Sequence, residues 1–124
     1  MTAEIAQFFD RFAADFTLFD GPLIATRYAT PYTAVSNEGD IKFFGDSAAI
    51  GRYFQLLLDD YGAQNITLCR YHSLHSEAIS DVCSLATVHW EMLSQAGELV
   101  TDWRESYTLL MTDAGLKIFT SMDH

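Results

Sequence analysis

The second half of the chain is a succession of four strand-like segments joined by short loops. They span about residues 65–78, 82–93, 99–112 and 115–122. In a β-strand, successive side chains point to opposite faces of the sheet. Because strands joined by short loops run antiparallel, this order predicts a meander of three long strands and a short one.

The first half of the chain has helical periodicity instead. Within residues 3–19, the apolar residues at helical spacing are Ile5, Phe8, Phe9, Phe12, Phe16 and Phe19, and this pattern predicts a first helix. We interpret its aromatic stripe as part of the core rather than as a ligand site. A second, short helix is expected to have Asp20 as its N-cap and Pro22 in its first turn, and to end before Pro31.

A hairpin and a third helix complete the pattern. The stretch "YTAVSNEGDIKFFG" has turn residues at positions 37–40, which is typical of a β-hairpin. The third helix is expected to begin at Asp46 or Ser47, with Gly62 just after its last residue. Three helices and a final meander predict an α+β fold, in which the helices pack on one face of a curved antiparallel sheet.

Composition narrows the class of protein. The 124 residues are enough for one domain with a core, which we expect to span residues 1–124. A net charge of −10 would be repelled by polyphosphate and by anionic lipid, so nucleic acid and membrane are not expected partners. No apolar run reaches the roughly 18 residues of a membrane span. The N-terminal stretch "MTAEIAQFFDRF" is acidic and amphipathic, unlike a signal peptide, so a cytoplasmic location is expected.

The two cysteines point to the same compartment. We expect Cys69 and Cys83 to be free thiols, because no register of the predicted sheet sets them opposite each other. The chain has no CxxC or HxxxH spacing, and its histidines and cysteines do not converge in fours. We therefore expect no metal site and no cofactor.

The predicted sheet has one face that is more apolar than the other. Suppose that the loop between the second and third long strands covers the six residues 93–98, and that the loop before the last strand covers the four residues 112–115. Ala86 then faces Glu105, and Leu109 faces Ile118. One continuous face then carries Ser84, Ala86, Val88, Trp90, Trp103, Glu105, Tyr107, Leu109, Ile118 and Thr120. The opposite face is more polar. A change of one residue in either loop would exchange the two faces.

Glu105 is the exception on the apolar face. Surrounded by Trp90, Trp103 and Tyr107, its carboxyl would lose water, and desolvation raises a carboxyl pKa toward the range used in acid–base chemistry. The alternative is a glutamate at the rim of the sheet, either solvated or paired with Arg27 or Arg70. Both interpretations remain open at this point.

A histidine is expected beside Glu105. If the loop before the second long strand covers residues 77–81, His72 joins the Glu105 face. If the first long strand continues to Ile79, Tyr71 and His75 join that face instead. Either histidine could form a general base with Glu105 as its orienting carboxylate. The alternative is a histidine that only forms hydrogen bonds within the sheet.

Three stretches resemble the nuclear transport factor 2-like superfamily, which includes the SnoaL-like polyketide cyclases and the ketosteroid isomerases. They are "TPYTAVSNEG" after two helices, "FFGDSAAIGRYFQLLL" at the third helix, and "SYTLLMTDAGLKIFTS" in the last hairpin. The resemblance covers essentially the whole chain. It implies a cone-shaped sheet wrapped around a pocket that the three helices close, and a homodimer formed through the outer face of the sheet.

The resemblance implies a ligand site but no particular reaction. Small apolar or aromatic molecules would contact Tyr28, Tyr32, Trp90, Trp103 and Tyr107, although packing in the core is the alternative role for the first two. The main expectation is a small-molecule-binding domain of the SnoaL-like type. The alternatives are a lyase, isomerase, cyclase or dehydratase that uses Glu105 with His72 or His75, and a non-catalytic dimerisation module.

One departure from the ketosteroid isomerases limits the catalytic alternative. Those enzymes have an aspartate base near the end of the first strand. The corresponding positions here are Ser36 and Asn37, followed by Glu38. The sequence therefore gives no support for isomerase chemistry of that particular kind.

Overall fold

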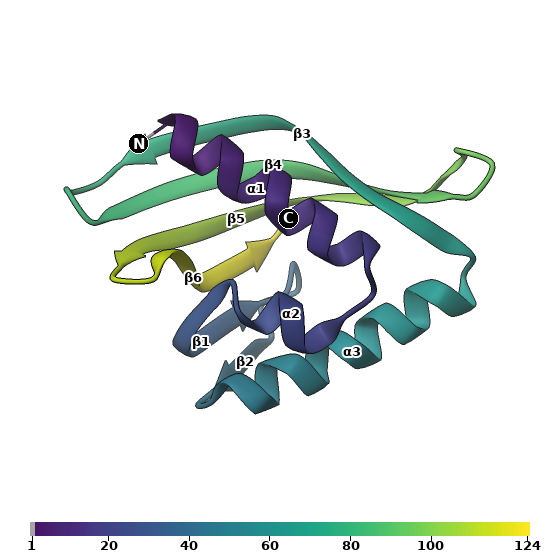
Figure 1. The fold of residues 1–124 in the computed structure, drawn as a ribbon, viewed down its shortest axis with the longest axis horizontal. Coiled ribbons are helices and arrows are strands. Elements are labelled where there is room, and N and C mark those ends of the chain that lie inside the picture. The colour runs from purple at the N-terminus through teal and green to yellow at the C-terminus, as the bar shows by residue number, and fades with distance from the viewer. Residues whose placement is uncertain (1) are drawn as a thin grey trace.

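The fold combines three helices with one six-stranded sheet (Figure 1). A computed structural model describes residues 2–124. The helices are α1 (Thr2–Thr17), α2 (Gly21–Ala25) and α3 (Ser47–Ala63). The strands are β1 (Tyr28–Val35), β2 (Ile41–Phe44), β3 (Ile66–Ala78), β4 (Cys83–Ser94), β5 (Leu99–Thr112) and β6 (Gly115–Asp123). The predicted α+β class is confirmed.

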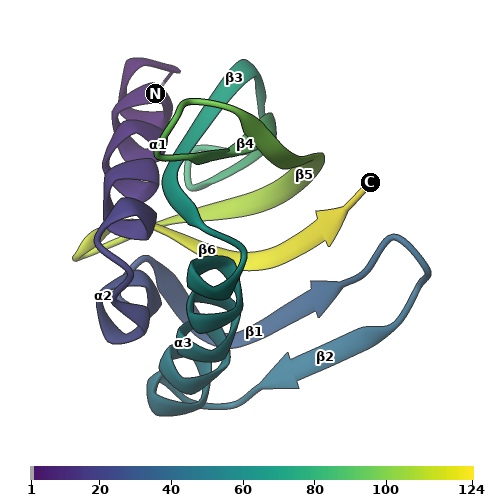
Figure 2. The same ribbon diagram turned by 90° about the vertical axis from the view of Figure 1, so that its right-hand side faces the viewer.

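The sheet is curved and does not close on itself. Its strand order is β2-β1-β6-β5-β4-β3, and Figure 2 shows all three helices on its concave side. Helix α1 packs on β3, and α2 packs on α3. The pairing is interrupted by β-bulges or irregularities between β1 and β6, β3 and β4, β4 and β5, and β5 and β6. Bulges bend a strand and increase its twist, which accounts for the curvature.

One strand pair departs from the expected antiparallel sheet. Strand β1 runs parallel to β6, whereas every other neighbouring pair is antiparallel. Parallel neighbours need a long crossover connection, and here β2, α3 and the first three strands of the meander lie between β1 and β6 in the chain. The sheet is therefore mixed, because a segment from the N-terminal half joins the free edge of the meander.

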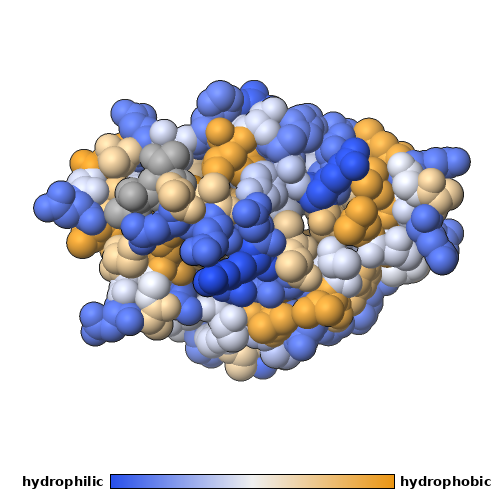
Figure 3. All heavy atoms as spheres, turned by 45° about the horizontal axis from the view of Figure 1, so that its top comes forward, coloured by the Kyte–Doolittle hydropathy of each residue, from blue (hydrophilic) through white to orange (hydrophobic). Residues whose placement is uncertain are grey.

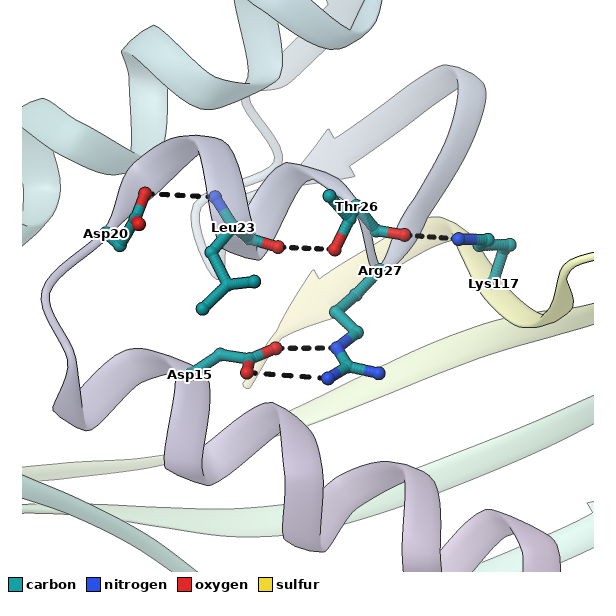
Figure 4. A network of polar contacts seen from close by, with 6 residues as sticks. All are labelled: Asp15, Asp20, Leu23, Thr26, Arg27 and Lys117. Carbon is teal, nitrogen blue, oxygen red and sulfur yellow. Dashed lines mark hydrogen bonds and ion pairs between the residues drawn. The ribbon is translucent and has the colours of Figure 1, made fainter.

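Helix α2 is shorter than expected, because the chain passes directly into β1. The N–H of Ile118 donates to the carbonyl of Arg27 at 2.9 Å, which holds this segment against β6. The Arg27 side chain forms an ion pair with Asp15 of α1, with 2.6 Å between Nε and Oδ2. Lys117 donates to the carbonyl of Thr26 (Figure 4). These contacts join α1, the end of α2 and β6.

The cap at Asp20 and the start of α3 at Ser47 were predicted correctly, and the end of α3 was not. Asp20 and Asp46 cap α2 and α3, each carboxylate accepting from the backbone N–H three residues further on. Gly62 lies inside α3, which ends at Ala63. Asn65, with φ of 63°, adopts the left-handed conformation expected of a residue after a helix. Asparagine adopts this conformation more readily than most residues other than glycine.

The aromatic stripe of α1 forms the centre of the core. Phe9 and Phe12 are fully buried. The ring centroid of Phe12 lies 5.7 Å from that of Trp90 and 6.2 Å from that of Tyr107. Burying a side chain of this size stabilises the fold by about 1.5 to 3 kcal/mol. The stripe therefore fixes α1 across the concave face of the sheet. Its interpretation as part of the core is confirmed.

The strand registers confirm the predicted faces but not all the predicted partners. Glu105 lies opposite Val88 rather than Ala86, because only four residues, 95–98, separate β4 from β5. A shift of two residues leaves every side chain on its original face. Leu109 faces Ile118, as predicted.

The predicted position of Thr120 is wrong. Thr120 pairs with Thr108 on the outer face, and Ser121 takes the place opposite Tyr107. The cause is a bulge in β6, where Phe119 is an extra residue between the partners of Leu109 and Thr108. An extra residue moves all later side chains of a strand to the opposite face.

The two thiols and the surface complete the description. Cys69 and Cys83 are free, as predicted, and Cys69 lies opposite Met92.

Figure 3 shows one face of the molecule, on which hydrophobic residues form separate groups among hydrophilic ones. Within residues 2–124, no helix is both long enough and apolar enough to cross a membrane.

Candidate functional site

A pocket of about 380 Å³ lies on the concave side of the sheet. It is bounded by the β1–β2 hairpin, α3, β5 and β6. Half of its lining residues are aromatic or aliphatic: Tyr32, Ala34, Val35, Tyr53, Phe54, Leu57, Tyr61 and Trp103. Its charged side chains are Asp40, Lys42, Glu105 and Asp123. A mainly apolar pocket with a few convergent polar groups is the usual form of a small-molecule site.

Glu105 and Asp123 form the polar centre of this pocket. They occupy opposed positions on β5 and β6. Trp103 Nε1 donates to Glu105 Oε1 at 3.0 Å. Trp90 Nε1 donates to the hydroxyl of Tyr107 at 2.7 Å, and Tyr107 in turn forms a side-chain hydrogen bond with Glu105. Two indoles and a phenol therefore fix the orientation of the Glu105 carboxyl.

Both carboxyl groups hold their protons more tightly than usual. Burial raises the pKa of Glu105 to about 8, and the negative charge of Asp123 acts in the same direction, while the bonds from Trp103 and Tyr107 oppose it. Burial also raises the pKa of Asp123, which a hydrogen bond with Glu105 and the charge of His124 offset in part. Two desolvated carboxyls this close do not ionise independently. Near neutral pH, the pair therefore retains a proton.

The two ion pairs considered for Glu105 are not formed. Arg70 forms an ion pair with Glu91, with 2.8 Å between Nε and Oε1. Arg27 is bound to Asp15. Neither arginine pairs with Glu105, whose half-buried side chain lines the pocket.

The five expected ligand-contact residues divide into three groups. Tyr32 and Trp103 line the pocket, and the Tyr32 hydroxyl shares a hydrogen bond of 2.5 Å with Ser121. Tyr107 lies behind Glu105 and contacts the carboxyl rather than the open space. Tyr28 and Trp90 belong to the buried core and do not line the pocket.

The structure places neither expected histidine on the pocket face. Strand β3 follows the second of the two predicted registers as far as Tyr71, which lies opposite Trp90. A bulge then follows, with Ser73 at φ of 57°. His72 lies opposite His89, and His75 opposite Thr87, both on the outer face.

The expected His–Glu pair is therefore absent. Both histidines are exposed, and the ring of His72 stacks on His89, with 4.6 Å between centroids. Both registers considered from the sequence assumed an uninterrupted strand. His72 lies outside because the first of these registers is not adopted, and Tyr71 takes the place opposite Trp90 instead. The second register set His75 on the pocket face, but the extra residue at the bulge between His72 and His75 reverses the face of everything beyond it.

Several polar pocket residues were not predicted, among them Asp40, Lys42, Ser121 and Asp123. Ser121 and Asp123 reach the pocket only because of the β6 bulge, which the sequence does not signal. Lys42 could have been found, because it alternates with the outward Ile41 and Phe43 in β2. Tyr53 and Tyr61 belong to α3 and also line the pocket.

A family model matches nearly the whole chain. The model described as "NTF2-like protein (DUF6841)" covers residues 3–124. No curated protein matches the sequence.

Several solved structures have a similar fold. Aln2 from a Streptomyces species matches with a TM-score of 0.81 and 12% identity, over 99% of this chain and 89% of that chain. An NTF2-like protein with a cystatin-like fold from Novosphingobium aromaticivorans matches with a TM-score of 0.77 and 12% identity, over 98% and 79%. A candidate dehydratase of the NTF2-like family from Streptomyces avermitilis matches with a TM-score of 0.73 and 14% identity, over 98% and 92%. At these identities, the similarity shows the fold alone.

Proposed function

Because the chain belongs to the family described as NTF2-like protein (DUF6841), we propose that it binds a small, largely apolar molecule in the pocket centred on Glu105. The expected resemblance to the nuclear transport factor 2-like superfamily is confirmed by this membership. The observation that carries the proposal is the pocket itself. Its volume of about 380 Å³ falls in the range of small-molecule sites, roughly 300 to 1,000 Å³.

The walls and the polar centre of the pocket would contact different parts of the ligand. Tyr53, Tyr61 and Trp103 supply apolar area for the body of the ligand. Glu105 and Asp123 supply a hydrogen-bonding position for one polar group. Burying two carboxyls without a full set of partners costs free energy, and residues kept at such a cost usually serve function rather than stability.

Proton transfer is the second candidate function. The observation that favours it is the opposed carboxyl pair, in which the pKa of Glu105 is about 8. An acid with a pKa near the working pH can both give and take a proton in one cycle. Glu105 would act as the acid or base on a bound ligand, and Asp123 as its partner. Isomerase-type and dehydratase-type reactions both need this chemistry, and the candidate dehydratase from Streptomyces avermitilis shares the fold.

A homodimer through the outer sheet face is the expected assembly. The outer side chains of the central strands are small and uncharged at Thr87, Ser106 and Thr108. Leu85 beside them is 42% exposed and Met122 is 50% exposed. A surface of small polar side chains with exposed apolar side chains suits a self-complementary interface.

A panel of small metabolites tests the binding and proton-transfer proposals together. Each compound is incubated with the protein, and both the melting temperature and the disappearance of the compound are measured. We expect at least one apolar compound to raise the melting temperature. Turnover that Glu105→Gln abolishes would support proton transfer, whereas stabilisation without turnover would support binding alone.

The matched control is Glu98→Gln, which makes the same change at an exposed position in the β4–β5 loop. It should leave stabilisation and turnover unchanged. If no compound raises the melting temperature of the wild-type protein, the proposed binding function is wrong. Compounds that stabilise the wild type and Glu105→Gln equally would show that the ligand lies elsewhere.

A further inference from the structure

We propose that the molecule bound in this pocket is an organic amine, whose protonated nitrogen lies between Glu105 and Asp123 and whose apolar body packs on the aromatic wall. This inference rests on the proposed binding function and names its ligand class. It is argued from three features of the pocket: the balance of its charges, the contact that its own lysine makes, and its size.

The charged groups of the pocket are mostly acidic. Three carboxyls, from Asp40, Glu105 and Asp123, line it together with one ammonium, from Lys42. Within residues 3–124, neither Glu105 nor Asp123 forms an ion pair with a lysine or arginine. His124 is the one basic group that acts on Asp123. The carboxyl pair therefore has room for a cation that the chain does not itself supply.

The wall of the pocket already carries one ammonium group. Lys42 Nζ lies over the ring of Tyr53, 4.8 Å from its centroid. An ammonium within about 6 Å of an aromatic centroid is attracted by the negative face of the ring. Tyr53 lines the same pocket as Glu105. The protein's own side chain thus shows that this wall accommodates an alkylammonium, which is the chemical group proposed for the ligand.

Other ligand charges fit the pocket less well. An anion would have to approach two carboxyls, and the one cation near it, Lys42, is exposed in the edge strand β2 and already lies on Tyr53. The net charge of −10 would also repel an anion and attract a cation at long range. A neutral ligand would leave the carboxyl pair without a countercharge.

The size of the pocket limits the amine. A cavity of about 150 Å³ holds one benzene ring, and this pocket measures about 380 Å³. An arylalkylamine with one ring and a short chain fits this space. The ring would contact Tyr61 and Trp103, while the chain places the nitrogen at the carboxyl pair.

Binding of such an amine has a consequence for the proton that the pair holds. A cation beside a carboxyl favours its ionised form. The proton on Glu105 should therefore leave when the ammonium enters, so that binding releases up to about one proton near neutral pH. A neutral alcohol that only accepts a hydrogen bond from Glu105 would release none.

Three probes with the same aromatic body separate the possibilities: phenethylamine, phenethyl alcohol and hydrocinnamate. Binding to the full chain is measured by calorimetry in two buffers of different ionisation enthalpy, with the melting temperature as a second measurement. We expect the amine to bind at least about tenfold more tightly than the other two. Its binding heat should change with the buffer in the direction of proton release.

The failure of this inference differs from the failure of the proposed function. Tighter binding of the alcohol or the acid would overturn the amine while leaving a functional pocket. Failure of all three probes, when the metabolite panel yields a neutral or anionic ligand, would also overturn it. Failure of every compound in the panel would remove the proposed function and this inference together.

Asp123→Asn and Lys42→Met test the placement of the nitrogen, with Asp113→Asn as the control. Asp123→Asn should weaken phenethylamine about tenfold and leave phenethyl alcohol unaffected, since it removes a charge and keeps the shape. Asp113→Asn makes the same change at an exposed position in the β5–β6 turn and should alter neither. Lys42→Met should strengthen amine binding, because it removes the ammonium nearest the site. An unchanged affinity in Asp123→Asn would overturn the assignment.

Discussion

Glu105 and Asp123 lie directly opposite each other on neighbouring strands, and both carboxyls open into one pocket. This relationship depends on the bulge at Phe119, because an uninterrupted β6 would direct Asp123 to the opposite face. One extra residue therefore converts a single buried carboxyl into a pair. Burial, with the negative charge of Asp123 acting in the same direction, raises the pKa of Glu105 to about 8, where it exchanges protons near neutral pH.

Glu105→Gln should change how stability depends on pH. The pKa of Glu105 rises from 4.5 to about 8 on folding, so the folded state holds a proton that the unfolded state has lost. Wild-type stability should therefore fall as pH rises through this window. The variant lacks this group, so its stability relative to wild type should increase with pH by about 1 to 4 kcal/mol over the window. Urea unfolding at several pH values measures the difference.

The control for this experiment is Glu98→Gln, at an exposed loop position. Its stability should follow the wild type at every pH. Parallel pH curves for wild type and Glu105→Gln would mean that the carboxyl is ionised in the folded protein, which would contradict the raised pKa.

Tyr107→Phe should lower the stability of the fold and raise the pKa of Glu105. The change leaves the buried N–H of Trp90 without its acceptor, at a cost of about 1 to 3 kcal/mol. It also removes a hydrogen bond that lowers the pKa of Glu105, so this pKa should rise further. Chemical denaturation measures the first effect and a carbon-13 NMR titration of the carboxyl measures the second.

Tyr61→Phe provides the comparison. Tyr61 also lines the pocket, but its hydroxyl has no hydrogen-bond partner among residues 3–124. Loss of this hydroxyl should cost little stability and leave the pKa of Glu105 nearly unchanged. Equal effects of the two substitutions would contradict a specific role for the Trp90–Tyr107 contact.

Leu85→Arg should dissociate the proposed dimer. Leu85 lies on the outer sheet face opposite Thr108 and is 42% exposed, and an arginine pair across a two-fold axis would bring like charges together. Leu56→Arg makes the same change on α3, at a side chain that is 71% exposed and outside the sheet. Sedimentation velocity at micromolar concentration should find a monomer for the first variant and a dimer for the second. A wild-type protein that sediments as a monomer would contradict the interface.

The sequence specified the faces of the sheet better than its details. Trp103, Glu105 and Tyr107 could be placed together because side chains alternate along a strand, and a register shift of two residues leaves each of them on the same face. The two bulges could not be predicted, because an extra residue at Ser73 or Phe119 depends on tertiary packing rather than on a local pattern. These bulges account for the outward position of His75 and for the missed Asp123, whereas His72 lies outside because the other of the two expected registers is adopted. The pocket was therefore half predictable: its β5 side followed from alternation, and its β6 side did not.

The last prediction concerns the contact that holds α2 on α3 and so fixes the helical wall of the pocket. A Cβ added to Gly21 would lie 2.4 Å from the carbonyl oxygen of Gly51 and 2.7 Å from the backbone nitrogen of Gln55. Backbone atoms of a helix cannot move aside cheaply, so Gly21→Ala should destabilise the fold by about 1 to 3 kcal/mol. It should also weaken ligand binding, because α3 carries Tyr53 and Tyr61.

Gly51→Ala is the matched control on the facing helix. Its new Cβ would meet nothing closer than 3.4 Å, the distance to Pro22 Cα, and alanine is favoured over glycine inside a helix by about 1 kcal/mol. Gly51→Ala should therefore be neutral or stabilising, although both glycines lie at the same contact. Thermal and urea unfolding of the two variants measure the contrast. Equal stability of Gly21→Ala and Gly51→Ala would show that α2 can move away from α3 without cost, and that the close approach at Gly21 does not hold the wall in place.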